Sequence, residues 1–187
     1  MSTPTHQLHR KWYTSIFGLQ NAGRNTTTGQ KSEEVYKAGI VDINEFDTVE
    51  GFWSFMHALP QLSSILPAKG GPNIQCFQHG ISPTWEDPQH AQGCRLRVEI
   101  LANEIDSAWN EVIMALVGEQ FGDLGDHITG VVCSLKYSKR IDLWMNTDHK
   151  ETVRTIATKL KTLLNKQKCT FDGFDESLPP SEKRYDL

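Results

Sequence analysis

The residues with the clearest chemical potential lie between Pro83 and Arg95. Trp85 and Glu86 are adjacent, and Arg95 follows after a polar stretch. An indole face attracts a cationic ring, a carboxylate accepts two parallel N–H bonds from one edge of a base, and a guanidinium meets phosphate through its planar fork. Together these groups could bind an electron-poor, phosphorylated purine. The competing interpretation is a core tryptophan beside a solvated turn carboxylate, because aromatic residues more often pack than bind.

Composition places the chain among ordinary globular proteins. Its 187 residues are 38% hydrophobic and 22% charged, which suits a single domain with its own core. The net charge of −4 argues against nucleic-acid binding through overall charge, so such contact needs a local basic patch. The N-terminus has no apolar signal region, and no run approaches the roughly 18 apolar residues that span a membrane. We therefore expect a cytoplasmic protein that does not bind membranes.

The cysteines and histidines do not suggest a metal site. The four cysteines are isolated, without a C-x-x-C pair, and the seven histidines are scattered without ligand spacing. We expect reduced, buried thiols, no metal and no cofactor.

Periodicity predicts strands interleaved with three helices. Alternating patterns predict strands over residues 10–17, 35–43, 74–79, 94–100, 128–137 and 140–145, and a short one over 169–171. The helices should begin at three capping residues, each with an acidic partner three positions on: Asp47 with Glu50, Asn103 with Asp106, and Asp148 with Glu151. This order indicates one sheet with helices on a single face and the polar face open for ligand. Residues 1–9 should be a flexible arm, and residues 175–187 a flexible tail.

Three ordered motifs give the chain a resemblance to the translation initiation factor 4E family, which binds the mRNA 5′ cap. They are Phe46–Trp53 (FDTVEGFW), Gly80–Asp87 (GISPTWED) and Ile141–Trp144 (IDLW). The resemblance implies a single α+β cap-binding domain over residues 10–174. In such a domain a curved antiparallel β-sheet carries three long helices on its convex face and the ligand slot on its concave face.

The resemblance also implies how a 7-methylguanosine cap is held. Trp85 and Tyr36 would stack on the two faces of the methylated base, with Tyr36 in the place of a second tryptophan. Glu86 would read the N1 and N2 donors of guanine, and Trp144 would lie against the N7-methyl group. The implied phosphate-binding residues are Arg95, Lys136, Lys139 and Arg140.

A second surface follows from the same resemblance. It would bind the helical motif of a 4G-type scaffold or a 4E-binding repressor, as a helix laid over an exposed aromatic patch. The implied contact residues are Val49, Trp53, Asn110, Glu111 and Met114. Asn110 stands where the family usually has an apolar residue, and His6-Gln7 where it has His-Pro. Together with Tyr36, these departures suggest a divergent paralogue of the sort found in trypanosomatids.

Enzyme motifs are missing from the sequence. There is no G-x-S-x-G elbow, no H-E-x-x-H and no Walker loop, and the adjacent Glu86 and Asp87 would point apart as a glycosidase pair. We expect a binding protein and no enzyme. Two alternatives stay open: a hydrolase of capped or free nucleotides, and a 4E-like protein-interaction module with little cap affinity.

Overall fold

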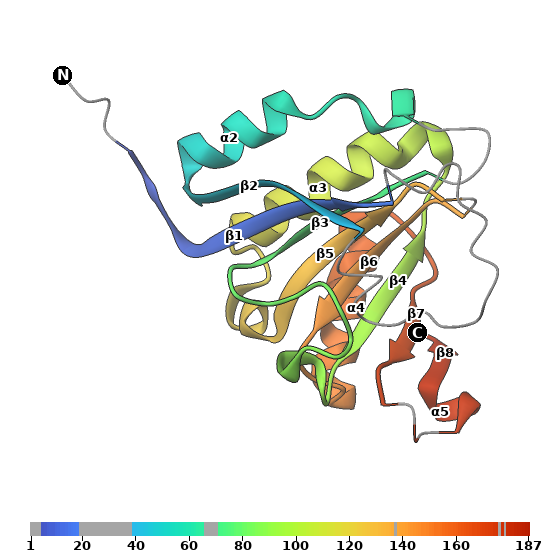
Figure 1. Ribbon diagram of the computed structural model, residues 1–187. Helices are drawn as coiled ribbons and strands as arrows, with labels where there is room; N and C mark the ends of the chain where they lie inside the picture. The colour runs from blue at the N-terminus through green and yellow to red at the C-terminus, as the bar shows by residue number, and fades with distance from the viewer. Residues whose placement is uncertain (1–4, 19–38, 66–70, 137, 176, 178) are drawn as a thin grey trace.

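The sheet contains all the strands of the chain that the structure describes (Figure 1). This computed structural model describes residues 5–18, 39–65, 71–136, 138–175, 177 and 179–187. Within those residues eight strands form one curved sheet in the order β2-β1-β3-β5-β6-β4-β7-β8, and all neighbouring strands are antiparallel. The strands are β1 (Gln7–Phe17), β2 (Ile40–Thr48), β3 (Asn73–Gln78), β4 (Cys94–Glu99), β5 (Ile128–Ser134), β6 (Arg140–Met145), β7 (Thr170–Gly173) and β8 (Arg184–Asp186).

Three helices pack on one side of this sheet, as Figure 1 shows. They are α2 (Val49–Ala58), α3 (Ile105–Val117) and α4 (Lys150–Leu163), and a single-turn α5 (Pro180–Lys183) follows near the end of the chain. The predicted α+β class, antiparallel sheet and one-sided helices are confirmed.

The core between helices and sheet follows the predicted periodicities. Cys94, Leu96 and Val98 of β4 are buried toward the helices, whereas the alternate residues Arg95 and Arg97 lie on the opposite, open face. The apolar stripe of α3 is buried as predicted. Burying each large apolar side chain contributes about 1.5–3 kcal/mol, so this stripe fixes α3 on the sheet.

The helix caps differ from the predictions. α2 is capped by Thr48 and not by Asp47: the Thr48 hydroxyl accepts a hydrogen bond from the Gly51 N–H at 3.1 Å. Glu50 does not close a capping box, because it accepts hydrogen bonds from the backbone N–H of His6 (3.0 Å) and contacts the His6 ring.

The caps predicted for the other two helices are also wrong. Asn103 lies in a 3-10 turn before α3, and Asp106 accepts the backbone N–H groups of Leu62 and Ser63 from another segment. α4 begins after His149 without a side-chain cap, so Asp148 does not cap it. A neighbouring residue therefore caps α2, tertiary contacts engage Glu50 and Asp106, and α4 has no side-chain cap.

The ends of the chain are more ordered than expected. Residues 7–9, assigned to a flexible arm, belong to β1. Residues 180–186, assigned to a flexible tail, form α5 and β8, and β8 pairs with β7. The rings of Phe171 and Tyr185 stack across these strands with centroids 4.7 Å apart. The predicted second strand also begins late, at Ile40, and residues 35–38 lie outside the described part of the chain.

Candidate nucleotide-binding face

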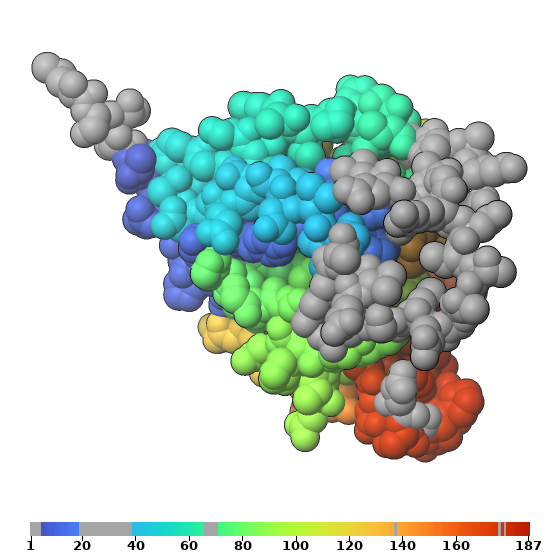
Figure 2. All heavy atoms as spheres, viewed as in Figure 1, coloured from blue at the N-terminus to red at the C-terminus, as the bar shows by residue number. Residues whose placement is uncertain are grey.

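The turn between β3 and β4 presents Trp85 to solvent. The indole is 54% exposed, and Glu86 beside it is exposed and has no hydrogen bond or ion pair within the described residues. The turn itself is fixed by Asp87, whose carboxylate accepts the N–H groups of Ser82 (2.8 Å) and Gln89 (2.9 Å). An exposed indole and a carboxylate without a partner among the described residues therefore stand on a turn whose backbone is held in place. Figure 2 shows this segment, in green, on the front surface of the molecule.

A small aromatic cluster supports the turn from the open face of the sheet. Phe77, Val132 and Trp144 are buried there, with Phe174 packed against them. The Trp144 ring lies 5.6 Å from Phe77 and 4.6 Å from Phe174, measured between centroids. Trp144, predicted to contact the base, thus lies in the packed layer beneath the turn and is only 6% exposed.

Gly130 permits this packing. It stands between Phe77 and Trp144 in the sheet register. A Cβ atom at this position would lie 2.5 Å from the Phe77 ring, which is too close for any side chain. The absence of a side chain at Gly130 of β5 therefore makes room for the Phe77 ring of the cluster.

His90 joins the cluster to the turn. It is fully buried, its Nδ1 lies 2.7 Å from the Thr84 carbonyl oxygen, and its Nε2 lies 2.9 Å from the Thr129 hydroxyl. A carbonyl can only accept, so Nδ1 carries the proton and neutral Nε2 accepts from Thr129. Burial lowers the pKa of His90, although the Thr84 carbonyl opposes this shift. His90 is therefore a neutral side chain that supports Thr84, the residue before Trp85, through a hydrogen bond.

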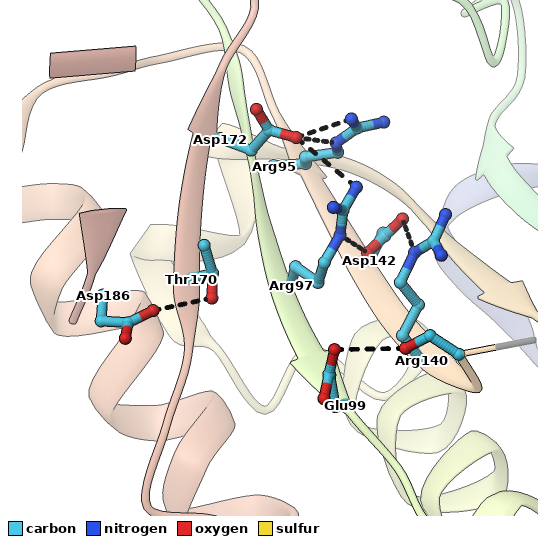
Figure 3. Close-up of polar contacts among 9 residues, drawn as sticks. Arg95, Arg97, Glu99, Arg140, Asp142, Thr170, Asp172 and Asp186 are labelled. Carbon is cyan, nitrogen blue, oxygen red and sulfur yellow. Dashed lines mark hydrogen bonds and ion pairs between the residues drawn. The ribbon is translucent and has the colours of Figure 1, made fainter. Parts of the chain in front are cut away.

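A row of alternating charges lies beside the cluster (Figure 3). Arg95 donates from Nε and Nη2 to one oxygen of Asp172, at 2.8 and 2.6 Å. Arg97 bridges both carboxylates, at 3.0 Å to Asp142 and 3.4 Å to Asp172. Arg140 donates from Nε to the other oxygen of Asp142 at 3.1 Å. These five residues, here called the arginine row, carry three positive and two negative charges.

The arginine row is continuous with the aromatic cluster. The Arg95 guanidinium carbon lies 5.8 Å from the Trp144 ring centroid, within cation–π range. The two residues face each other across β4 and β6 in the sheet register. Cations suited to phosphate thus begin directly beside the aromatic cluster.

The other predicted nucleotide-binding residues are less closely grouped. Lys136 and Lys139 lie on the β5–β6 connection, where the Lys139 ammonium donates to the Lys136 carbonyl at 2.6 Å and the Lys136 ammonium lies 5.6 Å from the Phe17 ring centroid. Tyr36 falls outside the described residues.

A cavity of about 510 Å³ opens on the same face, between β1, β2 and the turn. Its lining includes Tyr13, Asp42, Ser82 and Pro83. The Tyr13 hydroxyl donates to Asp42, and burial together with that contact raises the pKa of Tyr13 to about 12. The cavity reaches the first residues of the turn, Gly80 to Pro83, and Trp85 is not among its lining residues.

A separate apolar surface lies on the helix side. Trp53 is 43% exposed, and Val49 and Met114 are also exposed large hydrophobic residues. Asn110 and Glu111 are exposed on α3. The predicted partner-binding residues thus lie at the surface of α2 and α3. Asn110 also lines a cavity of about 240 Å³ between the end of α2 and α3.

Sequence reasoning missed four residues of the nucleotide-binding face. The sequence favours a solvated strand charge at Arg97, Asp142 lies within the IDLW motif but receives no role from it, and Asp172 and His90 belong to no motif. The available signal was a charged residue at the open-face position of each of three strands. Only the strand register, which places Arg97 opposite Asp142 and Arg95 opposite Asp172, turns those charges into a row.

The described ranges offer neither a metal site nor a membrane-spanning helix. No three His, Cys, Asp or Glu side chains there gather closely enough to hold a metal ion. No helix there combines the length and apolar character that a membrane crossing needs.

The sequence is similar to eukaryotic translation initiation factors 4E over nearly its whole length. A sequence model of the family described as Eukaryotic initiation factor 4E matches residues 7–186. The eukaryotic translation initiation factor isoform 4E of Arabidopsis thaliana is 34% identical over 180 residues, covering 92% of this chain and 84% of the plant protein. The isoform 4E of Arachis hypogaea is 32% identical, covering 97% of this chain and 86% of that protein.

Solved structures with the same fold include two from nematodes. The C. elegans eIF4E-3 complex with the 4E-binding protein Mextli and cap analog matches with a TM-score of 0.80 and 25% identity, covering 98% of this chain and 100% of that chain. The Ascaris suum eIF4E-3 complex with the m2,2,7G cap matches with a TM-score of 0.80 at 23% identity, covering 98% and 99%, and supports the fold alone.

Proposed function

Because this chain belongs to the eukaryotic initiation factor 4E family, we propose that it binds the 7-methylguanosine 5′ cap of mRNA in translation initiation or its regulation. The observation that carries the proposal is the pairing of an exposed indole with an adjacent free carboxylate on a fixed turn. Trp12, Trp109 and Trp144 are buried, and the other exposed tryptophan, Trp53, lies on the helix side. Among the described residues, Trp85 is therefore the tryptophan that offers an accessible ring on the open face of the sheet.

Each part of the cap meets a matching group on this face. Methylation at N7 gives the base a positive charge, which favours stacking on Trp85. Glu86 accepts the N1 and N2 donors of guanine through two parallel bonds, which adenine cannot supply. Tyr36 is the proposed second stacking partner, and Trp144 supports the base from below.

The phosphates extend from the base toward the arginine row. Arg95 and Arg140 retain N–H groups beyond those given to the carboxylates. Lys136 and Lys139 add charge from the β5–β6 connection. A cap phosphate chain would therefore run along β4 and β6.

The partner surface is proposed for the opposite side of the molecule. The C. elegans relative was solved with a 4E-binding protein, and Val49, Trp53, Asn110, Glu111 and Met114 form the surface of α2 and α3 that would accept a helical motif. A 4G-type scaffold or a 4E-binding repressor is the proposed partner. A cytoplasmic location, which suits this role, is part of the proposal.

Titration with a cap analogue tests the proposal. 7-Methylguanosine triphosphate should quench tryptophan fluorescence, because the base stacks on Trp85, and the nucleotide should be recovered unchanged. Release of 7-methylguanosine or a shortened nucleotide would identify a hydrolase. Absence of quenching, with partner binding retained, would identify a protein-interaction module with little cap affinity.

A further inference from the structure

The two carboxylates of the arginine row have no place in the proposed binding of phosphate. Asp142 is 2% exposed and Asp172 is 9% exposed, and each lies between two guanidiniums. A negative group beside an anion site weakens that site, and a buried one is poorly screened by salt. Their position therefore has a consequence for the ligand.

We propose that Asp142 and Asp172 set the charge that the cap phosphates meet, so that the site takes the bridging triphosphate of a capped RNA and gains little from the extra charge of a free terminal phosphate. The inference rests on the proposed cap-binding function and specifies its ligand class.

The hydrogen bonds leave the outer arginines available. Arg140 gives only Nε to Asp142, and Arg95 gives Nε and Nη2 to a single oxygen of Asp172. Their remaining N–H groups can meet phosphate while both carboxylates stay in place. Arg97 is different, because it donates to both carboxylates and lies in the middle of the row. The outer two arginines are the phosphate ligands, and Arg97 connects the two carboxylates.

The charge of the row decides which phosphates it favours. With two of its three positive charges balanced, the row presents one net positive charge. A bridging phosphate carries one negative charge, whereas a terminal phosphate carries about 1.5 to 2 at neutral pH. Three unbalanced positive charges would give a terminal phosphate a clearly higher affinity than a bridging phosphate. With one net positive charge, the arginine row adds little affinity for the extra charge of a terminal phosphate.

The carboxylates could also help phosphate binding by orienting the arginines, but this benefit is smaller than the loss of attraction that their negative charges cause. The three arginine side chains are between 12% and 24% exposed, so packing already restricts them. Removal of one carboxylate charge acts at short range on every charge of the phosphate chain. Neutralising a carboxylate should therefore strengthen phosphate binding.

The test compares three ligands on four proteins: wild type, Asp142→Asn, Asp172→Asn and the control Asp186→Asn. The control removes the same charge from β8 on the same sheet, but Asp186 contacts Thr170 and Lys168 and no arginine of the row. The ligands are 7-methylguanosine, 7-methylguanosine triphosphate and the dinucleotide m7GpppG, titrated by fluorescence at one fixed salt concentration.

The wild type should bind the triphosphate and the dinucleotide with dissociation constants within about threefold of each other. Asp142→Asn and Asp172→Asn should each bind the triphosphate about tenfold more tightly. Their affinity for the nucleoside should stay unchanged. Asp186→Asn should change the dissociation constants of all three ligands little.

Unchanged or weaker triphosphate binding by a folded Asp172→Asn variant would overturn the inference, as would a wild-type preference above about tenfold for the free triphosphate. Asp172 lies near the sheet edge, where a substitution disturbs folding less. The Asp172→Asn variant therefore tests the inference even if Asp142→Asn does not fold. Failure of the wild type to bind any of the three ligands would instead overturn the proposed function.

Discussion

The imidazole of His90 packs against the indole of Trp144, with ring centroids 5.1 Å apart and planes inclined at 62°. The same imidazole holds the Thr84 carbonyl, one residue before Trp85. The buried layer and the exposed indole are thus joined through one titratable side chain.

Stability should fall when the solution is acidified through the histidine range. The pKa of His90 is lowered by burial, so the unfolded chain takes up the proton first. The stabilisation from neutral His90 is fully present above the unfolded pKa of about 6.5 and is lost as the pH falls toward the lower folded pKa. The Tm, measured from pH 8 to pH 5.5, should decline below about pH 6.5.

A His90→Gln variant should lose that component of the pH dependence. The matched control is His9→Gln, because His9 is exposed. A wild-type Tm that stays flat to pH 5.5 would contradict the buried neutral assignment.

Base recognition should depend on Trp85 and Glu86 separately. Trp85→Ala should remove cap binding and its fluorescence quenching. Glu86→Gln should weaken 7-methylguanosine triphosphate binding by about tenfold or more, because hydrogen bonds to a charged group contribute about 1.5–3 kcal/mol. It should also erode the preference for guanine over adenine, as competition with adenosine triphosphate would measure. Glu151→Gln is the control, because Glu151 is an exposed residue of α4. Equal losses in both glutamate variants would count against base recognition by Glu86.

Partner binding should be separable from cap binding. Trp53→Ala should weaken capture of a helical 4E-binding peptide by about 30-fold or more, as expected for an aromatic residue at the centre of an interface. Its affinity for the cap should match the wild type, because Trp53 lies on the helix side of the sheet. Trp85→Ala is the reciprocal control and should retain the peptide.

The polar Asn110 should restrict which peptides bind. Asn110→Leu restores the apolar residue usual in the family, so it should tighten binding of a peptide with an apolar side chain at this contact. No gain in that measurement would place Asn110 outside the interface.

The cysteines should be unreactive in the folded protein. All four are buried, and burial raises the pKa of each thiol, to about 12 for Cys169. Since the thiolate is the reactive form, a disulfide reagent at pH 8 should modify no thiol in native protein and four after denaturation. Rapid modification of any one in native protein would show that its segment opens.

The sequence predicted the helices and strands better than it predicted the side-chain contacts that begin or connect them. The alternation of β4 and the stripe of α3 are local patterns, and both predictions are confirmed. All three predicted caps are wrong: Thr48 caps α2 in place of Asp47, α4 begins without a side-chain cap, and tertiary contacts engage the carboxylates expected to complete the caps of α2 and α3. Asp106, for example, holds the backbone of residues 62 and 63.

The candidate site was predictable where it depends on one segment. Trp85 and Glu86 share a turn, so their proximity follows from the local sequence, whereas the exposure of Trp85 was expected only from the family resemblance. The arginine row draws on β4, β6 and β7, and pairing between Arg95 and Asp172, 77 positions apart, requires the register of two strands. The roles of Tyr36 and the lysines stay predictions.

Strand β8 pairs with β7 and covers the edge of that strand next to Asp172. Its pairing with β7 occupies backbone donors and acceptors that would otherwise face solvent as an open edge. A chain shortened before α5 would expose that edge and invite neighbouring molecules to add strands there. The short C-terminal ribbon thus protects the edge of the strand that carries Asp172.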